Sequence, residues 1–522
     1  MSRSYYLFKK NLFSLIIILA MSFCAQASAA NWYVDNAASG SNDGTSWTEA
    51  WESFADVVWG GGGVIPGDTL YISGGSTSKT YNESLTIGAS GSSGSLITVR
   101  VGQDANHNGT VIITNASGPG IYVISKNYVT ISGNYNDQCK IRVTGCSTDG
   151  VQLWGNSTNI VLTYVEVDFN GNANNEDGID ISVSSTTKPA YEVSYCKIHD
   201  NYQDQIHGGR QVENSDYGYV LIHHNEIYNC NDDGIETAVE GMDIYENTMH
   251  TLVSNGGSGH PDGIVVMYSY GRIWNNTVYN FGDPLGVKIS NSYIYPNMFA
   301  QTEGESKGHL RIYNNLMYST LDPYDSQWPM GIYFSAQKAA GATYTALEDV
   351  VIANNTIVGM FFSGIGAFFC ATAEDNISDF IIENNVIFNC GRKGSAYPAV
   401  MIGNTDEPFT MGSHGDGKDI TYDHNLLYEG TNGNTDHKFK GILYSYPNFK
   451  NLDTGGAGIK SQDTDAEILD NLVGRGISLS QYFNNDKNGL SRPQGAEWDM
   501  GCYEYVYPPS LIEPVTNFEL SN

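Results

Sequence analysis

The sequence predicts an all-β fold in which short parallel strands wind into a solenoid of roughly ten or more coils. An Asp-Gly-aliphatic motif recurs, with 27 to 29 residues between its first five copies, and a second motif, with Asn two residues before an aliphatic residue, recurs out of phase with it. Neither motif has the 3.6-residue period of a helix. A unit of this length cannot bury its apolar side alone, so it must stack on copies of itself.

The first motif marks one strand in each coil. Its copies and variants begin at Asp149, Asp177, Asp204, Asp233 and Asp262, and then at Leu285, Met330 and Ser363. Because side chains alternate along a strand, we expect the aliphatic residue of each motif to point inward and the next residue to point outward.

The second motif places an Asn at a turn of each coil. Its members are Asn225, Asn247, Asn276, Asn315, Asn355, Asn385 and Asn425, and Cys196 holds the same place one coil earlier. An inward Asn can hydrogen-bond the backbone of the turns above and below it, which stacking would otherwise leave unpaired. Leucine-rich repeats are the competing solenoid, but this unit lacks their Leu spacing and their helical half.

The first residues differ from the repeat. Lys9 and Lys10 precede an apolar run over 12–21, and a small-residue cleavage motif follows at 27–29. This order is typical of a signal peptide, which we assign to residues 1–29. We therefore expect the mature protein to be secreted.

We predict that residues 30–506 form one solenoid domain, followed by a tail or linker stub at 507–522. The stretch 50–58 predicts a short amphipathic helix that caps the first coil. Residues 495–505 are expected to close the last coil.

The composition excludes several partners. The formal net charge is −31, and 41% of the residues are hydrophobic. Phosphates would be repelled at long range, so we expect neither nucleic acid nor an anionic membrane as a partner. The apolar fraction argues against disorder. After the signal peptide no segment reaches the ~20 apolar residues of a membrane span, and we expect a monomer without membrane insertion.

The two ends and the Asn motif resemble a known group of proteins. The opening Trp32-Tyr33-Val34-Asp35, the segment Pro66-Gly67-Asp68-Thr69 and the closing stretch 499–505 look like secreted right-handed parallel β-helix proteins of bacteria. This resemblance implies a right-handed parallel β-helix. The group includes pectate lyases, alginate lyases, epimerases, hydrolases and proteins of no known activity, so the fold leaves the function open.

The outward residues of the first motif form a column of chemical interest. In coil order they are Gln152, Asp180, His207, Glu236, Val265, Lys288 and Tyr333. Adjacent coils lie ~4.8 Å apart, which crowds the carboxylates of this column and of the preceding turn. Like charges at this distance raise each other's pKa or recruit a cation.

Four of these acidic residues predict a calcium site. Asp204, Asp232, Asp233 and Glu236 offer the hard carboxylate oxygens that Ca²⁺ prefers. An Asp before Gly is also a common turn former, and this is the role we expect for Asp149 and Asp262. The doubled Asp and the outward Glu are not required by turn chemistry, which favours a metal site there.

The same residues resemble a narrower pattern in family 9 polysaccharide lyases, which are pectate lyases. There, an Asp-Asp-Gly-aromatic-Asp segment and an Asp of the preceding coil bind calcium, and a Lys in a Gly-aromatic-Lys segment is the base. Asp232-Asp233-Gly234-Ile235-Glu236, Asp204 and Gly286-Val287-Lys288 match this pattern. Ile235 and Val287 depart from it by replacing the aromatic residues.

The resemblance implies cleavage of an acidic polysaccharide such as pectate by calcium-dependent β-elimination. Lys288 would be the base, with Arg210 and bound calcium lowering its pKa, and His207 lies in the same column. Lys288 could instead be a solvated cation that pairs with Asp180 or Glu236. Asp180, His260, Tyr268 and Tyr333 are candidate substrate-binding residues.

Three other functions remain open at this stage. The Asp232-Asp233 pair, Gly259-His260 and Lys288 also resemble family 28 glycoside hydrolases, the polygalacturonases, whose two carboxylates stand ~6.5–9.5 Å apart in inverting enzymes. A uronate C5-epimerase would use much of the same apparatus. A surface protein that binds calcium and glycans would use exposed tyrosines such as Tyr268 and Tyr270 without catalysis.

Overall fold

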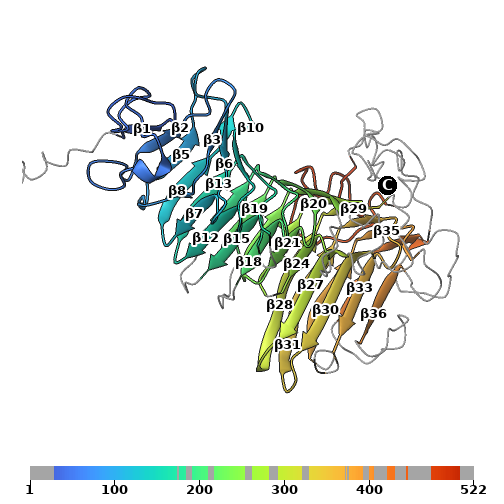
Figure 1. Cartoon of the computed structure of the whole chain (residues 1–522). Helices are drawn as coiled ribbons and strands as arrows, with labels where there is room; N and C mark the ends of the chain where they lie inside the picture. The colour runs from blue at the N-terminus through green and yellow to red at the C-terminus, as the bar shows by residue number, and fades with distance from the viewer. Residues whose placement is uncertain are drawn as a thin grey trace, which may run out of the picture.

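The computed structural model describes residues 29–172, 176–183, 191–209, 217–252, 261–267, 269–280, 292–319, 329–370, 372, 376–391, 399–404, 420–428, 443–444 and 472–505. In these residues the strands form three long sheets whose neighbouring strands are all parallel. Consecutive coils therefore stack side by side, as Figure 1 shows. The predicted parallel β-helix is confirmed.

We name each sheet after its first strand. The β1 sheet contains β1 (Asn31–Val34), β2 (Thr69–Ile72), β5 (Ile97–Val101), β8 (Asn127–Ser132), β13 (Thr158–Thr163), β16 (Tyr191–Ser194), β19 (Val220–His223), β22 (Met242–Tyr245), β25 (Arg272–Trp274), β28 (Glu303–Tyr313), β31 (Thr343–Ala353), β34 (Ile377–Glu383) and β37 (Ile420–Asp423).

The β3 sheet contains β3 (Ser78–Tyr81), β6 (Thr110–Ile113), β11 (Ile141–Thr144), β14 (Val165–Asp168), β17 (Lys197–His199), β20 (Glu226–Cys230), β23 (Thr248–Leu252), β26 (Thr277–Tyr279), β29 (Leu316–Tyr318), β32 (Thr356–Val358), β35 (Val386–Phe388), β38 (Leu426–Tyr428) and β39 (Leu443–Tyr444). A separate short antiparallel pair consists of β9 (Asn134–Tyr135) and β10 (Gln138–Cys139).

The β4 sheet carries the candidate site. It contains β4 (Leu85–Thr86), β7 (Ile121–Ile124), β12 (Val151–Gly155), β15 (Ile179–Val183), β18 (Ile206–Gly209), β21 (Ile235–Thr237), β24 (Ile264–Val266), β27 (Ser292–Ala300), β30 (Met330–Lys338), β33 (Ile365–Phe369) and β36 (Val400–Asn404).

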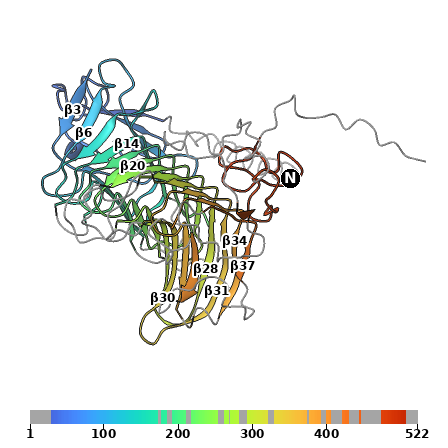
Figure 2. The same cartoon turned by 90° about the vertical axis from the view of Figure 1, so that its right-hand side faces the viewer.

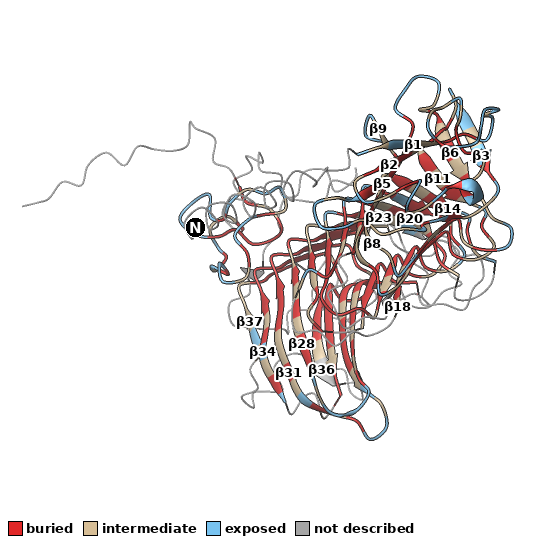
Figure 3. Cartoon of the chain, turned by 90° about the vertical axis from the view of Figure 1, so that its left-hand side faces the viewer, coloured by how far each residue is buried: buried red, intermediate tan, exposed pale blue. Residues whose placement is uncertain are grey.

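The inward aliphatic residues of the first motif form a continuous core column, in which Ile294 takes the place predicted for Val287. Burial of one such side chain stabilises the fold by about 1.5–3 kcal/mol. The column is in register along the β4 sheet, and none of its side chains is exposed. Figure 3 shows buried residues along the strands of the solenoid. Its members are Val151, Ile179, Ile206, Ile235, Ile264, Ile294, Ile332 and Ile365.

The predicted Asn ladder joins the coils at the turn between the β1 and β3 sheets. Asn247 illustrates its bonds: Oδ1 accepts both the backbone N–H and the side-chain N–H of Asn225 at 3.0 Å, and Nδ2 donates to the carbonyl of Ile222 at 2.8 Å. Cys196 ends the ladder by donating its backbone N–H to Asn225. These asparagines are buried, so their amides satisfy backbone groups that water cannot reach.

The later coils are wider than the sequence predicts. β24 and β25 have three residues each, whereas β27 and β30 have nine and β28 and β31 have eleven. These long strands form an extension that projects from the solenoid in Figures 1 and 2. Phe334 and Phe380 pack edge to face within it at 5.0 Å.

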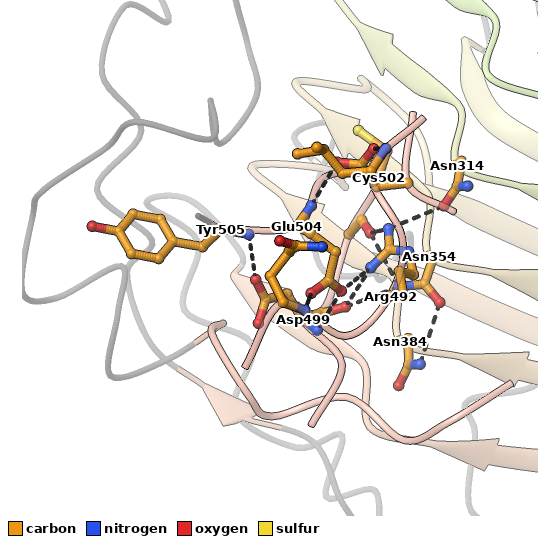
Figure 4. A network of polar contacts seen from close by, with 12 residues as sticks. Asn314, Asn354, Asn384, Arg492, Asp499, Cys502, Glu504 and Tyr505 are labelled. Atoms are coloured by element: carbon orange, nitrogen blue, oxygen red, sulfur yellow. Dashed lines mark hydrogen bonds and ion pairs between the residues drawn. The ribbon is translucent and has the colours of Figure 1, made fainter. Parts of the chain in front are cut away.

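The closing segment, residues 472–505, lies against the side of the solenoid. Residues 472–505 lie along the side of several coils, where Asn314, Asn354 and Asn384 bond their backbone. Arg492 pairs with Glu504 at 2.6 Å, and both are buried (Figure 4). The segment thus covers the corner between the β1 and β3 sheets along several coils, which the sequence did not predict.

Helical structure is nearly absent from the described part of the chain. The helix predicted over 50–58 is reduced to one 3-10 turn, η1 (Phe54–Asp56), with Ser53 as its N-cap. Among the described residues, none belongs to a helix long and apolar enough to cross a bilayer.

Candidate functional site

Five aspartates form a buried ladder at the turn that leads into the β4 sheet. In each step, one carboxylate oxygen accepts the backbone N–H of the aspartate one coil later, at 2.6–3.1 Å. The ladder consists of Asp149, Asp177, Asp204, Asp233 and Asp262. This is the turn role expected for Asp149 and Asp262, and Asp204 and Asp233 make the same bond.

Burial makes this ladder electrostatically costly. Burial raises the pKa of Asp177 to about 7, although nearby His207 opposes the shift, and it raises the pKa of Asp262 to about 8. Burial and neighbouring carboxylates raise the pKa of both Asp204 and Asp233 well above the usual value. Such a group must take up protons or share a cation.

Three carboxylates converge at the centre of the ladder. Asp204, Asp233 and Glu236 each offer an oxygen, and these oxygens lie within 4.8 Å of one another. Asp204 is only 1% exposed, and its Oδ2 has no hydrogen-bond partner. An unpaired buried carboxylate oxygen among other hard oxygens fits a calcium ion, which takes six to eight oxygen ligands at ~2.3–2.6 Å.

Asp232, the fourth predicted ligand, lies at the edge of this cluster. Its backbone N–H donates to the carbonyl of Gln203 at 3.3 Å. Its charge contributes to the raised pKa of Asp204 and of Asp233. Asp232 is therefore near the cluster without belonging to the set of oxygens that lie within 4.8 Å of one another.

The predicted outward column is correct over most of its length. Gln152, Asp180, His207, Glu236 and Val265 pair in register across five strands. The next position is different from the prediction.

Tyr295, and not Lys288, pairs with Val265. Tyr295 stacks on Tyr333 with ring centroids 4.8 Å apart, so the predicted place of Tyr333 in the column is consistent with the structure. The placement of Lys288 in this column is wrong, because the strand that pairs with β24 puts Ile294 and Tyr295, seven residues after Val287 and Lys288, in the inward and outward positions.

His207 stands between two acidic side chains. Its Nδ1 lies 3.4 Å from Asp180 Oδ1 and 3.5 Å from Asp177 Oδ2. Burial lowers its pKa, but the adjacent Asp180 and the charge of Asp177 outweigh this and raise it to about 9. The ring is therefore a cation at neutral pH, which partly offsets the acidic ladder.

Asp180 is held from the other side by an indole. Trp154 Nε1–H donates to Asp180 Oδ2 at 2.7 Å. Asp180 was predicted to bind substrate, yet its two oxygens face Trp154 and His207. Trp154 was missed, although the sequence places it two residues after Gln152, on the outward face of its strand.

A second cluster lies on the β3 sheet and was not predicted. Glu166, Asp168 and His199 bring ligand atoms within 4.8 Å of one another. Here Arg142 already supplies positive charge, because its Nε donates to Asp168 Oδ1 at 3.0 Å. His199 also contacts Asp200 at 2.7 Å. Within the described part of the chain, no Arg or Lys side chain forms an ion pair with Asp204, Asp233 or Glu236, so we take this cluster as the candidate metal site.

Four predicted residues lie outside the described part of the chain. These are Arg210, His260, Tyr268 and Lys288. Their roles in catalysis and substrate binding stay predictions.

Comparisons with known proteins find similarity among solved structures alone. No protein-family model and no curated protein matches the chain. Among solved structures, the chain is similar to an alginate lyase from Paenibacillus sp. str. FPU-7, with 15% identity and a TM-score of 0.39 over 53% of this chain and 91% of that one.

It is also similar to pectate lyase Pel9A, with 12% identity and a TM-score of 0.41 over 92% of this chain and 97% of that one. A third similar structure is a GH136 lacto-N-biosidase from Eubacterium ramulus, with 13% identity and a TM-score of 0.40 over 80% of this chain and 70% of that one. At these identities and TM-scores the likeness assigns no activity to this chain.

Proposed function

We propose that the protein is a secreted, monomeric polysaccharide lyase that depends on calcium and cleaves an acidic, uronate-containing polysaccharide such as pectate by β-elimination. One observation carries the proposal: Asp204, Asp233 and Glu236 converge within 4.8 Å, with Asp204 Oδ2 buried and unpaired. An acidic protein that acts on an acidic polymer needs a cation between the two.

The chemistry assigns a role to each group. Calcium held by Asp204, Asp233 and Glu236, with Asp232 nearby, would neutralise the uronate carboxylate and the charge that develops when the C5 proton leaves. Lys288 removes that proton, the C4–C5 double bond forms, the C4–O bond breaks, and the leaving oxygen takes up a proton. A lysine with its usual pKa of ~10.4 is protonated at neutral pH, so Arg210 and the cation must lower that value.

The remaining predicted residues would hold the polymer. His260, Tyr268 and Tyr333 are the proposed sugar contacts, and His207 is proposed as a further catalytic residue. Tyr333 has direct support, since it belongs to the outward stack with Tyr295 on the same sheet as the acidic cluster.

One screen tests the proposal. The protein is incubated with pectate, alginate and a neutral polysaccharide, with calcium or with excess chelator, and the unsaturated product is followed by its ultraviolet absorbance. We expect absorbance to rise with an acidic polymer only when calcium is present. New reducing ends without this absorbance would instead indicate a hydrolase, C5 inversion without cleavage an epimerase, and binding without any product a glycan-binding protein.

Two variants test the proposed role of Lys288 as the base. Lys288→Ala should abolish product formation and leave calcium binding intact. Lys338→Ala is the matched control, because Lys338 is an exposed lysine at the end of β30. If both variants keep full activity, Lys288 is not the base.

A further inference from the structure

Three side chains from three successive coils make one connected chain on the outer face of the β4 sheet. Trp154 of β12 donates its indole N–H to Asp180 of β15 at 2.7 Å. Asp180 Oδ1 lies 3.4 Å from Nδ1 of His207 on β18, which is an ion-pair contact and not a hydrogen bond. Trp154 itself packs edge to face against Tyr122 of the preceding coil at 6.1 Å. The indole is thus anchored at one end and the imidazole lies at the other.

A second carboxylate holds the same imidazole nitrogen. Asp177 Oδ2 lies 3.5 Å from Nδ1 of His207. The other oxygen of Asp177 accepts the backbone N–H of Asp204 at 3.1 Å, so this carboxylate cannot turn away without breaking a bond between coils. With Nδ1 facing two fixed carboxylates, Nε2 is the nitrogen that remains for a ligand.

A glycine makes room for the ring. A Cβ on Gly209 would lie 3.1 Å from Cε1 of His207 and 3.9 Å from Asp180 Oδ1. Gly209 is two residues after His207, so both point to the same face of β18. A methyl group there would be closer to the ring than an ordinary van der Waals contact, so the imidazole would have to shift by a few tenths of an ångström.

The ring stands beside the acidic cluster. His207 pairs in register with Glu236 on the neighbouring strand, one coil spacing of ~4.8 Å away. Its side chain is 32% exposed, whereas those of Asp177 and Asp180 are 4% and 14% exposed. The imidazole is therefore more accessible to a polymer on this face than either of the two carboxylates that it contacts.

We propose that Trp154 and Asp180 are positioning residues that fix the imidazole of His207, so that its Nε2–H donates a hydrogen bond to the sugar residue next to the one held at the Asp204 cluster. The statement about the sugar rests on the proposed function, whereas the positioning of the ring does not. Removing one fixed donor from a catalytic site costs about a hundredfold or more in rate, and misplacing it costs less.

The experiment compares two variants with a matched control. Trp154→Phe keeps a ring but loses the indole N–H, and Gly209→Ala displaces the imidazole. Trp47→Phe removes an equivalent indole bond, from Trp47 Nε1 to Asp104 at 2.7 Å, in a distant coil. On the polymer identified by the screen, Trp154→Phe and Gly209→Ala should lower kcat about tenfold or more, with calcium affinity and melting temperature equal to those of Trp47→Phe.

A second readout needs no activity. In the substrate-free protein, a slowly exchanging imidazole N–H proton should appear downfield of the amide protons in the proton NMR spectrum and vanish in His207→Ala. It should shift in Trp154→Phe and not in Trp47→Phe. If the shift occurs but no polymer is cleaved, the positioning stands and the proposed function fails. If Trp154→Phe and Gly209→Ala match Trp47→Phe in kcat, and the proton does not move, the positioning is overturned.

Discussion

Oδ1 of Asp204 accepts the backbone N–H of Asp233 at 2.9 Å, while Oδ2 of the same carboxylate is buried without a hydrogen-bond partner. One side chain thus ties two coils together and adds an unpaired oxygen to the acidic cluster. The two roles can be separated, because the first needs only an oxygen acceptor and the second needs a charge.

Asp204→Asn should separate them. The amide oxygen can still accept from Asp233, but the buried charge is gone, so the free energy of unfolding without metal should rise by about 1–3 kcal/mol. Calcium at a hundredfold excess over its Kd should stabilise the parent by about 2.7 kcal/mol and the variant by much less. Urea unfolding with chelator or calcium measures both. Asp204→Ala, which also loses the bond between coils, should be less stable than Asp204→Asn. If calcium stabilises Asp204→Asn as much as it stabilises the parent, Asp204 is not a calcium ligand.

The Asn ladder should be sensitive to a single truncation. Asn276 accepts from Asn247 and donates to the carbonyl of Ile244 at 2.9 Å and to Asn315 at 3.0 Å. Asn276→Ala leaves these buried partners unpaired, so we expect a loss of about 3 kcal/mol or more in the free energy of unfolding. Asn106→Ala, at an exposed asparagine, is the control for the same chemical change. A loss below about 1 kcal/mol would mean that water or neighbours replace the missing bonds.

Glu383 should make stability depend on pH. It faces Asp423 across β34 and β37, and burial together with this like charge raises its pKa from 4.5 to about 7. Between these two pH values the folded state binds more protons than the unfolded state, so the free energy of unfolding falls as pH rises from about 4.5 to about 7. Glu383→Gln should remove this part of the slope in urea unfolding from pH 4.5 to 8.

Asp423→Asn tests whether the charge of Asp423 contributes to the raised pKa of Glu383. Removing the opposing charge should reduce the contribution of Glu383 to the slope without abolishing it, because burial remains. A slope in Glu383→Gln identical to that of the parent would show that other carboxylates carry the whole pH dependence.

Phe169 should be replaceable with a gain in stability. Its φ of +53° is unfavourable for a bulky residue. Gly145 and Asp200 hold left-handed positions directly after the neighbouring strands, and Asn229 holds one near the end of β20. Its side chain is 58% exposed, so little burial is lost by truncation. Phe169→Asn should raise the free energy of unfolding by about 1 kcal/mol, measured by urea unfolding. Phe169→Ala should not raise the free energy of unfolding, because Ala is no more tolerant of a left-handed backbone than Phe. Equal stability of the two variants would show that Phe169 is not strained.

Much of the fold follows from local patterns. The alternation after each Asp-Gly pair predicts which side chain points inward, and Val151, Ile179 and Ile206 do so. The wide coils were missed, although the spacing of the Asn motif carries the signal. It lengthens from 29 residues between Asn247 and Asn276 to 39 and 40 residues in the next two steps, which provides the chain for the extension.

The error at Lys288 has a different cause. Both Gly286-Val287-Lys288 and Tyr293-Ile294-Tyr295 alternate in a way that suits an outward column. Only the register with β24 and β30 selects Ile294 for the core and Tyr295 for the outer face. Local alternation cannot make this choice, because both segments satisfy it.

The sequence by itself therefore determined the parallel β-helix, the inward and outward faces of its strands and the acidic character of one turn, since these depend on residues close together in the chain. The tertiary structure decided which coil supplies each residue of the column, the unpaired oxygen of Asp204 and the contact of Trp154 with Asp180. These depend on how coils about 28 residues apart stack, because burial and the distance between charges are set only when the coils meet.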